Sequence, residues 1–426
     1  MQNTDKRTAA LSLRANTLWN AFGCFFYLGC QWLTTVLVVR LSPDYNNSGM
    51  LAFAMAYGTI FASIGLYKIR AFQISDLNNE YSNGEYIGFR FVSIIMGLVL
   101  SVLYLPFTAS SIGFLYVSIT YLVFKSDEVF SDVFYGIYQR QERMDYIGKS
   151  QFLRGILSIN CFAIPLAITH NLIVALVVMS LSCICVTFFF DIPHAKLFGS
   201  VRPSLEFDKM KSLAATCFLA MLATLCANSI VSLVRQYYGL VYGSESLGIY
   251  ASVATPAVLI QVAATYLYSP LIGDLAKTRF NKGQEAFSRQ FIKVFILLTF
   301  VIVAFIIPLS LAGNPILQLV FGKSIAPYTY LFPYVLVATG CMGLLFYISD
   351  VLVVVRKIRE MLFCDVLALL AALLLAVILT RTIGMNGINF AIIGGSALAV
   401  IPSAFIILGS QKEEPSISSP KGNHAK

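Results

Sequence analysis

The stretch Tyr116–Gln139 has the apolar background of a membrane helix but also carries Lys125, Asp127, Glu128 and Asp132. At about 100° per residue, one stripe of such a helix collects most of its polar groups. Its members are Ser118, Tyr121, Lys125, Glu128, Asp132, Tyr135 and Gln139. A charge at the centre of a membrane helix costs roughly 2.5–3.5 kcal/mol on insertion scales. We therefore expect the stripe to face a water-filled cavity or a partner helix instead of lipid.

The composition also indicates an integral membrane protein. The chain is 58% hydrophobic and 12% charged, and its mean hydropathy is +0.77. Soluble domains contain about 25% charged residues. No cleavable signal peptide is expected, because the first apolar run is long enough to span and no small-residue cleavage site follows it.

About twelve segments are apolar over the roughly 20 residues that a spanning helix needs. They are residues 16–39, 49–67, 87–107, 112–137, 151–170, 171–190, 211–234, 247–271, 291–312, 330–355, 361–380 and 387–409. The sequence therefore predicts an all-α integral membrane protein with about 12 transmembrane helices.

The distribution of Lys and Arg predicts the orientation of these helices. With the N-terminus inside, all of the 30 basic residues fall in inner segments except Arg40, Lys125, Arg235, Lys323 and Arg381. Both termini are therefore expected in the cytoplasm. The net charge of +9 is explained by this bias and by anionic lipid headgroups, so nucleic-acid binding is not expected.

Four weak matches at a nearly constant offset indicate an internal repeat. Residues 48–52 (SGMLA) match 247–251 (LGIYA), Arg40 matches Arg235, Asp76-Leu77 matches Asp274-Leu275, and Gly84 matches Gly283. The offsets lie between 195 and 199 residues. Six crossings per repeat would make two parallel six-helix lobes, with a binding site between them. The expected organisation is an N-terminal lobe (1–190), a cytoplasmic linker (191–210), a C-terminal lobe (211–409) and a disordered cytoplasmic tail (410–426).

Three stretches carry a family resemblance. Arg70–Arg90 (RAFQISDLNNEYSNGEYIGFR), Asp132–Ser150 (DVFYGIYQRQERMDYIGKS) and Arg235–Pro256 (RQYYGLVYGSESLGIYASVATP) resemble segments of Wzx-type polysaccharide flippases. Those flippases belong to the multidrug/oligosaccharidyl-lipid/polysaccharide (MOP) exporter superfamily. The resemblance implies movement of an undecaprenyl-pyrophosphate-linked oligosaccharide from the inner to the outer leaflet of a bacterial cytoplasmic membrane, by alternating access through a cationic cavity.

The same resemblance sets expectations for partners. It implies a lipid-linked oligosaccharide substrate, membrane lipids, coupling to H⁺ or Na⁺, and association with other membrane proteins of polysaccharide assembly. The glycan's destination, such as capsule or O-antigen, stays open. No cofactor and no enzymatic activity are expected.

The candidate site residues fall into three sets. Substrate-binding candidates in the cavity are Arg40, Lys125, Glu128, Asp132 and Arg235; candidates for a gate or structural clamp are Arg70, Gln73 and Asp76; and candidates for ion coupling are Glu128, Asp132 and Asp350. Glu128 and Asp132 are like charges at i, i+4, which is unfavourable without a third group. Either an arginine from another helix bridges them, or one carboxyl carries a proton and forms a coupling site.

Other chemistries find less support in the residues. The chain has no GxxxxGK[ST] loop, its three histidines lack metal-ligand spacing, and its nine cysteines lie in apolar segments, so no metal site is predicted. Two alternatives to the flippase stay open. One is a membrane-embedded polysaccharide polymerase or glycosyltransferase, although the outer loops are short. The other is an ion-coupled small-molecule exporter of the same superfamily, which the acidic stripe would suit.

Overall fold

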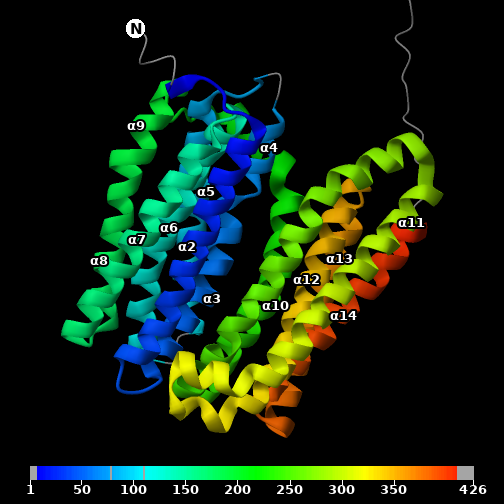
Figure 1. Ribbon diagram of the computed structural model, residues 1–426. Helices are drawn as coiled ribbons and strands as arrows, with labels where there is room; N and C mark the ends of the chain where they lie inside the picture. Colours follow the sequence, from blue (N-terminus) through cyan, green and yellow to red (C-terminus); the bar gives the residue numbers. More distant parts are fainter. Residues whose placement is uncertain (1–6, 77–78, 109–110, 410–426) are drawn as a thin grey trace, which may run out of the picture.

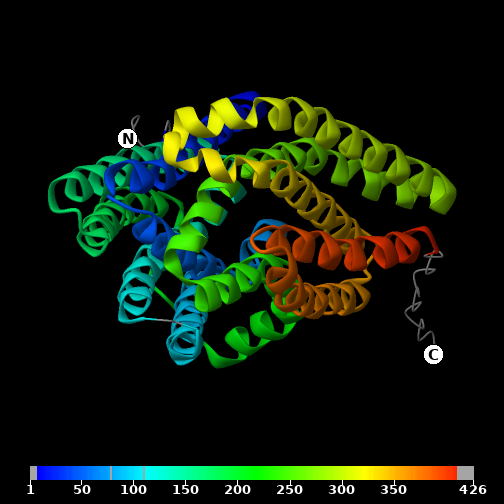
Figure 2. The same cartoon turned by 90° about the horizontal axis from the view of Figure 1, so that it is seen from below.

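The regular structure of this chain is helical throughout its described part. The computed structural model describes residues 7–76, 79–108 and 111–409. The predicted tail 410–426, and Leu77 of the repeat, lie outside the described residues. Figure 1 shows two groups of helices, α2–α9 and α10–α14, and Figure 2 shows the same division from below. The described chain includes nine segments long and apolar enough to cross a membrane, so the protein is a multi-pass membrane protein.

The first group is joined by short connections. It comprises α2 (Leu13–Leu41), α3 (Asn46–Leu66), α4 (Ile69–Ser75), α5 (Asn83–Tyr104), α6 (Ile112–Arg140), α7 (Met144–Thr169), α8 (Leu172–Val186) and α9 (Ile192–Ala195). A π-helical turn, Thr187–Asp191, links α8 to α9. Ser82 and Glu85 form a capping box that starts α5, because each side chain binds the other residue's backbone N–H.

The second group contains two very long helices. It comprises α10 (Phe207–Ala254), α11 (Val258–Phe321), α12 (Phe332–Val354), α13 (Ile358–Ile383) and α14 (Asn386–Gly409). Gly243 interrupts α10 with a φ of 85°, and Gly283 interrupts α11 with a φ of 81°. Glycine adopts these angles without the steric cost that a Cβ would bring. In Figure 1, α11 rises, arches over and returns.

In the described residues the structure gives nine candidate membrane spans where the sequence predicts about twelve, and the two numbers differ for two physical reasons. One candidate span, Phe207–Phe321, has 115 residues, about 170 Å as a straight helix, against a hydrocarbon core of about 30 Å. The interruptions at Gly243 and Gly283 divide this span. α6 is not among the nine spans, because its central part carries too many charged residues to count as apolar. The number twelve therefore stays a prediction.

The predicted loop at 191–210 is partly helical instead. The π-helical turn and α9 carry helical structure through Ala195, and a 3₁₀ turn follows at Lys196–Phe198. Pro193 does not end the helical structure: it lies directly after the π-helical turn, at the start of α9. α10 begins at Phe207, so the irregular connection is shorter than the sequence suggested.

The two groups meet most closely where α3 crosses α10. A Cβ on Gly49 would lie 1.7 Å from the Ser244 carbonyl oxygen, and one on Gly248 would lie 2.2 Å from the Tyr45 carbonyl oxygen. Gly49 and Gly248 belong to the two matching motifs of the repeat, so these motifs pack against each other. A buried apolar cluster that includes Phe53, Ile230 and Leu247 continues across the same contact.

This contact predicts that replacing Gly248 by alanine lowers the stability of the protein more than replacing Gly29. Gly248→Ala places a methyl group against backbone atoms, which costs roughly 1–3 kcal/mol when neighbours cannot relax. Gly29→Ala is the matched control, because a Cβ there meets nothing within 4 Å. We expect the melting temperature in detergent to fall for Gly248→Ala and to stay at the parent value for Gly29→Ala. Equal melting temperatures of the two variants would show that the backbones are not this close.

Candidate functional site

The middle of the α6 stripe is held by contacts with its own helix and with α2. Lys125 Nζ lies 2.6 Å from Glu128 Oε2, and the Tyr27 hydroxyl of α2 donates to Glu128 Oε1 at 3.2 Å. The Lys125 and Glu128 side chains are 23% and 28% exposed. Glu128 therefore has a partner on its own helix and one on α2.

The C-terminal end of the α6 stripe is bound by two arginines. Asp132 Oδ1 lies 3.0 Å from Arg70 NH1, and Asp132 Oδ2 lies 2.9 Å from Arg90 NH2. Arg90 is fully buried and also donates to the Gly65 carbonyl, whereas Arg70 is 29% exposed and also donates to Gln139. Two cations on one carboxylate leave a positive charge at the wall. Arginines from other elements thus bind Asp132, and Lys125 binds Glu128.

A second buried network lies on the opposite side of α6. Arg154 of α7 binds Asp127 at 2.6 Å and Asp191 at 3.1 Å, and it also donates to the Thr187 hydroxyl. The Thr187 hydroxyl in turn donates to Asp127 Oδ1 at 2.6 Å. Arg154 and Asp191 are 1% and 0% exposed. The π-helical turn brings Thr187 and Asp191 to this network, consistent with the use of such turns at special positions.

A basic cavity separates α6 from α10. It has a volume of about 280 Å³ and is lined by Lys68, Arg70, Lys125 and Asp132, with Thr224 and Asn228 of α10 on the other side. Three cations face one carboxylate there. An anion is the ligand that this charge balance favours.

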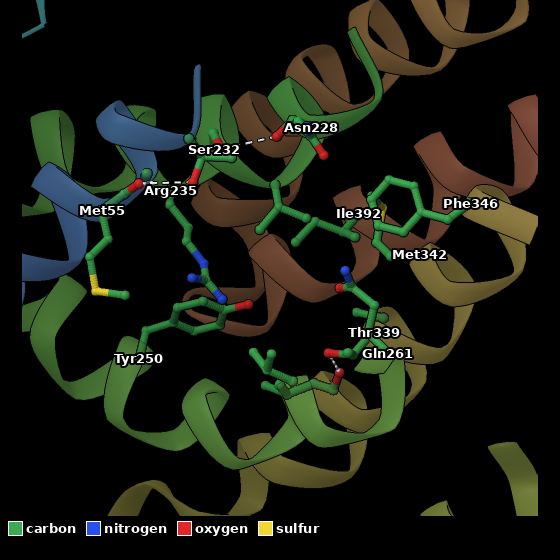
Figure 3. A pocket seen from close by; sticks show the side chains of 16 residues that line it. Met55, Asn228, Ser232, Arg235, Tyr250, Gln261, Thr339, Met342, Phe346 and Ile392 are labelled. Atoms are coloured by element: carbon green, nitrogen blue, oxygen red, sulfur yellow. Dashed lines mark hydrogen bonds between the residues drawn. The ribbon is translucent and has the colours of Figure 1, made fainter. Parts of the chain in front are cut away.

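The central cavity surrounds Arg235 (Figure 3). It has a volume of about 210 Å³, and its polar lining comes from four helices. These polar residues are Thr59 of α3, Asn228, Ser232, Arg235 and Tyr250 of α10, Gln261 of α11 and Thr339 of α12. The Arg235 guanidinium lies over the Tyr250 ring, 5.8 Å from its centroid. Among the described residues Arg235 forms no ion pair, so its charge is available to a ligand.

Arg235 also borders a second cavity of about 230 Å³ between α2, α3 and α10–α11. Its lining is mainly apolar, with Leu28, Val38, Leu51, Met55 and Val258. Three buried N–H donors of its wall have no hydrogen-bond partner within the described chain: Gln31 Nε2, Trp32 Nε1 and Arg235 Nε. An unmade buried hydrogen bond costs about 1–3 kcal/mol, so this wall would gain from a ligand with acceptor oxygens.

Arg40 has a different setting from its repeat partner Arg235. Arg40 is exposed at the end of α2, where its Nε donates to the Val320 carbonyl at 2.7 Å and its NH2 donates to the Leu319 carbonyl. A guanidinium at the last turn of α11 satisfies carbonyls that the helix leaves free and complements its dipole. Arg40 therefore ties α2 to α11 and lines neither cavity at Arg235.

Gln73 and Asp76 hold the connection after α3 in place. Gln73 is fully buried, and its Nε2 donates to the Val133 carbonyl of α6 at 3.3 Å. Asp76 accepts from the backbone N–H groups of Glu80 and Tyr81 and from the Tyr86 hydroxyl. Burial raises the pKa of Asp76, but these hydrogen bonds outweigh it and lower the pKa below its ordinary value.

Asp350 lies in the second group of helices, apart from the α6 stripe. It accepts a hydrogen bond of 3.0 Å from the Tyr268 hydroxyl of α11. It shares a small cavity of about 80 Å³ with Asp365 of α13, Lys68 and Thr224. The ion-coupling candidates therefore divide between the two groups of helices.

Sequence reasoning missed Arg90, Arg154, Thr187 and Asp191 as network members. Arg90 and Arg154 were assigned to the inner membrane surface, but the structure buries both. A signal was present, because both arginines fall inside the predicted spans 87–107 and 151–170. An arginine inside a spanning segment calls for an acidic partner.

Comparisons with known proteins agree with this geometry. No family model matches the chain. It is similar to the capsular polysaccharide biosynthesis protein CapF of Staphylococcus aureus, with 24% identity over 299 residues, which are 69% of this chain and 74% of that protein. Its structure is similar to the inward-facing conformation of a multidrug resistance MATE family transporter of the MOP superfamily. The TM-score is 0.70 at 13% identity, over 92% of this chain and 97% of that one.

The chain has the fold of a MATE transporter. This fold, and the similarity to a polysaccharide biosynthesis protein, agree with the resemblance that the three sequence stretches carry. The outward-facing conformation of a multidrug resistance MATE family transporter gives a lower TM-score of 0.58 at 15% identity, over 91% of this chain and 93% of that one. Of these two structures, the inward-facing one gives the higher TM-score.

The buried network predicts a large effect at Arg154. Arg154→Met leaves Asp127 and Asp191 buried without their cation, which costs about 3–5 kcal/mol in comparable buried pairs. Lys149→Met is the control, because Lys149 is 41% exposed and its partner Asp145 also binds Arg143. We expect the Arg154 variant to lose most of its folded membrane population, measured by fluorescence-detection size-exclusion chromatography. A profile like that of Lys149→Met would contradict the pairing.

The lowered pKa of Asp76 predicts a pH-dependent contribution to stability. An unfolded aspartate has a pKa of about 3.9, so the folded carboxylate stabilises the protein above that pH and loses this effect as the pH falls through its lower folded pKa. We expect Asp76→Asn to lower the melting temperature at pH 7, and the deficit to shrink on acidification below about pH 4. Glu245→Gln, at an exposed carboxylate, is the control. A deficit independent of pH would exclude the ionised form as its cause.

Proposed function

We propose that this protein flips an undecaprenyl-pyrophosphate-linked oligosaccharide from the inner to the outer leaflet of the bacterial cytoplasmic membrane. The observation that carries the proposal is the position of Arg235 between a polar cavity and an apolar one. A ligand that fits both must have an anionic centre, a polar part and an apolar part. A lipid-linked oligosaccharide has all three.

The two cavities at Arg235 would bind different parts of the substrate. The diphosphate would accept from Arg235, whose guanidinium can bind phosphate oxygens through two parallel hydrogen bonds. Gln31 and Trp32 would supply further donors. Sugar hydroxyls would meet the polar groups of the central cavity, and the start of the lipid tail would lie in the apolar cavity beside α2. The ligand would thereby replace its water before it crosses roughly 30 Å of hydrocarbon.

The basic cavity supports the same substrate class. Lys68, Arg70 and Lys125 line one side of this cavity, and Thr59 and Asn228 line both this cavity and the central one. A diphosphate entering from that side would meet positive charge before it reaches Arg235. Such a gradient favours entry of an anion over a neutral lipid.

The architecture that goes with this function is a pair of six-helix lobes. Residues 1–190 and 211–409 would be parallel repeats with twelve crossings in all and both termini in the cytoplasm. The breaks at Gly243 and Gly283 support this count, since they divide the 115-residue span into three parts. The contact between the repeat motifs at Gly49 and Gly248 supports the pairing of the lobes.

Two alternative functions each have one observation in their favour. The fold is that of proteins described as multidrug resistance transporters, and Asp350 and Asp365 line a cavity that would suit an ion-coupled small-molecule exporter. The name of the relative CapF refers to capsular polysaccharide biosynthesis, which also accommodates a polymerase or glycosyltransferase. The basic wall, and Arg235 with no ion pair among the described residues, favour an anionic substrate and therefore the flippase over a cationic drug.

Substitution of Arg235 tests the binding step. In proteoliposomes with lipid-linked oligosaccharide, we expect Arg235→Gln to lower the flipping rate by about tenfold or more, because the phosphate loses its charged donor. Arg235→Lys should retain part of the rate, since a point charge remains. Arg381→Gln, at an exposed arginine in the last turn of α13, is the control. An Arg235→Gln rate equal to that of the control would remove Arg235 from the site.

A strain lacking the gene tests the function itself. Lipid extraction and labelling of intact cells would show in which leaflet complete repeat units on undecaprenyl pyrophosphate reside. Units trapped in the inner leaflet support flipping. Unpolymerised units in the outer leaflet indicate an enzyme that acts later, and a normal lipid pool with altered sensitivity to toxic cations indicates a small-molecule exporter.

A further inference from the structure

Among the described residues before α10, Lys68 is the one that lines the small cavity of Asp350 and Asp365. The remaining lining residues come from α10, α12 and α13. Lys68 also lines the basic cavity, together with Arg70 and Lys125. The ammonium therefore stands between a positively charged wall on its own side and two carboxylates on the other.

The backbone directs Lys68 out of the helix that precedes it. Tyr67 and Lys68 both have left-handed conformations, with φ of 51° and 55°. A non-glycine residue in this region costs about 1–2 kcal/mol, so the surrounding structure has to hold the break. Tyr67 is buried, its hydroxyl donates to the Ala214 carbonyl of α10 at 3.4 Å, and its ring packs edge-on against Phe89. The break between α3 and α4 is thus fixed, and Lys68 projects from it.

The charges around Lys68 are not yet balanced in this conformation. Asp365 is 2% exposed, and its Oδ2 has no hydrogen-bond partner within the described chain. Asp350 has the Tyr268 hydroxyl on Oδ2. Lys68 is exposed and forms no ion pair among the described residues. Lys68 acts electrostatically on Asp350, but among the described residues it forms no salt bridge with Asp350 or Asp365, and all three line one cavity of about 80 Å³.

We propose that Lys68 is an electrostatic latch that binds Asp350 and Asp365 when the two helix groups close at this end of the molecule. The inference rests on the proposed transport function only for its purpose, since the latch itself needs no substrate. Closure would move α12 and α13 toward the α3–α4 break and remove water from the cavity. An ion pair strengthens when water leaves, so the pair would stabilise the closed form selectively. Repulsion from Arg70 and Lys125 would favour the same movement of Lys68.

The first test measures closure without a substrate. In a cysteine-free background, a reporter Thr224→Cys lines both cavities at the α10 wall. Lys68→Gln should raise the rate of its modification by a membrane-impermeant maleimide at least about fivefold, because the closed form loses its latch. Lys68→Asp should raise it further, and Lys68→Asp combined with Asp350→Lys should return it toward the parent rate. Lys282→Gln, at an exposed lysine of neither cavity, is the control.

The second test measures whether positions 68 and 350 come into contact. With Lys68→Cys and Asp350→Cys in one chain, a mild oxidant should form a disulfide that the maleimide then cannot label. A cross-link together with rescue by the charge exchange supports the latch. Absence of a cross-link between cysteines that are each reactive, or failure of the exchange to restore protection in a variant that reaches the membrane at the parent level, overturns it. Loss of flipping activity enters neither readout, so failure of the proposed function would be seen separately.

Discussion

The cost of a charge in hydrocarbon is the constraint on which the first helix group depends. α6 carries charged residues on two sides, and neither side can face lipid without a penalty of a few kcal/mol for each charge. Arg154 compensates Asp127 from α7, and Arg70 and Arg90 compensate Asp132 from α4 and α5. These ion pairs fix which helices surround α6, because each removes a charge that would otherwise be buried alone.

The excess of cations over carboxylates then gives the interior its chemical character. Arg90 is fully buried and binds Asp132, which also binds Arg70. Arg70 lines the basic cavity, so its charge there is only partly neutralised. Arg235 has the Tyr250 ring beside it and forms no ion pair with any described residue. A guanidinium inside a membrane protein without a counter-ion is unfavourable as long as no ligand occupies its cavity. The site therefore favours an anionic ligand that supplies the missing charge.

Contacts between the two helix groups are of two physical kinds. At the crossing of α3 and α10, glycines let backbones approach and leave no room for a side chain. Arg40 adds a charged cap on the end of α11 near the same part of the chain. At the basic cavity, by contrast, the groups are separated by polar and charged groups that bind or release partners without repacking. The transport that we propose needs both kinds, since the helix groups would rock about the first contact and open at the second.

The sequence determined that this chain is a helical membrane protein with a polar stripe on one helix; the two related halves stay a prediction. Hydropathy decides membrane insertion, and helical periodicity decides which residues share a face, so both can be read from one segment at a time. The same reasoning placed Lys125, Glu128 and Asp132 together, and the structure pairs Lys125 with Glu128 as their spacing allows. The motifs around Gly49 and Gly248 were also visible as a repeat.

Only the tertiary structure decided the partner of each charge. Asp127 and Asp191 meet at Arg154 from positions 64 residues apart in the sequence, and no local pattern encodes that meeting. Arg40 and Arg235 occupy matching places in the predicted repeat, yet one caps a helix end and the other faces two cavities. Whether a charged side chain is capped, paired or left for a ligand depends on which distant helix packs against it. That choice is made by the assembly of all the helices together.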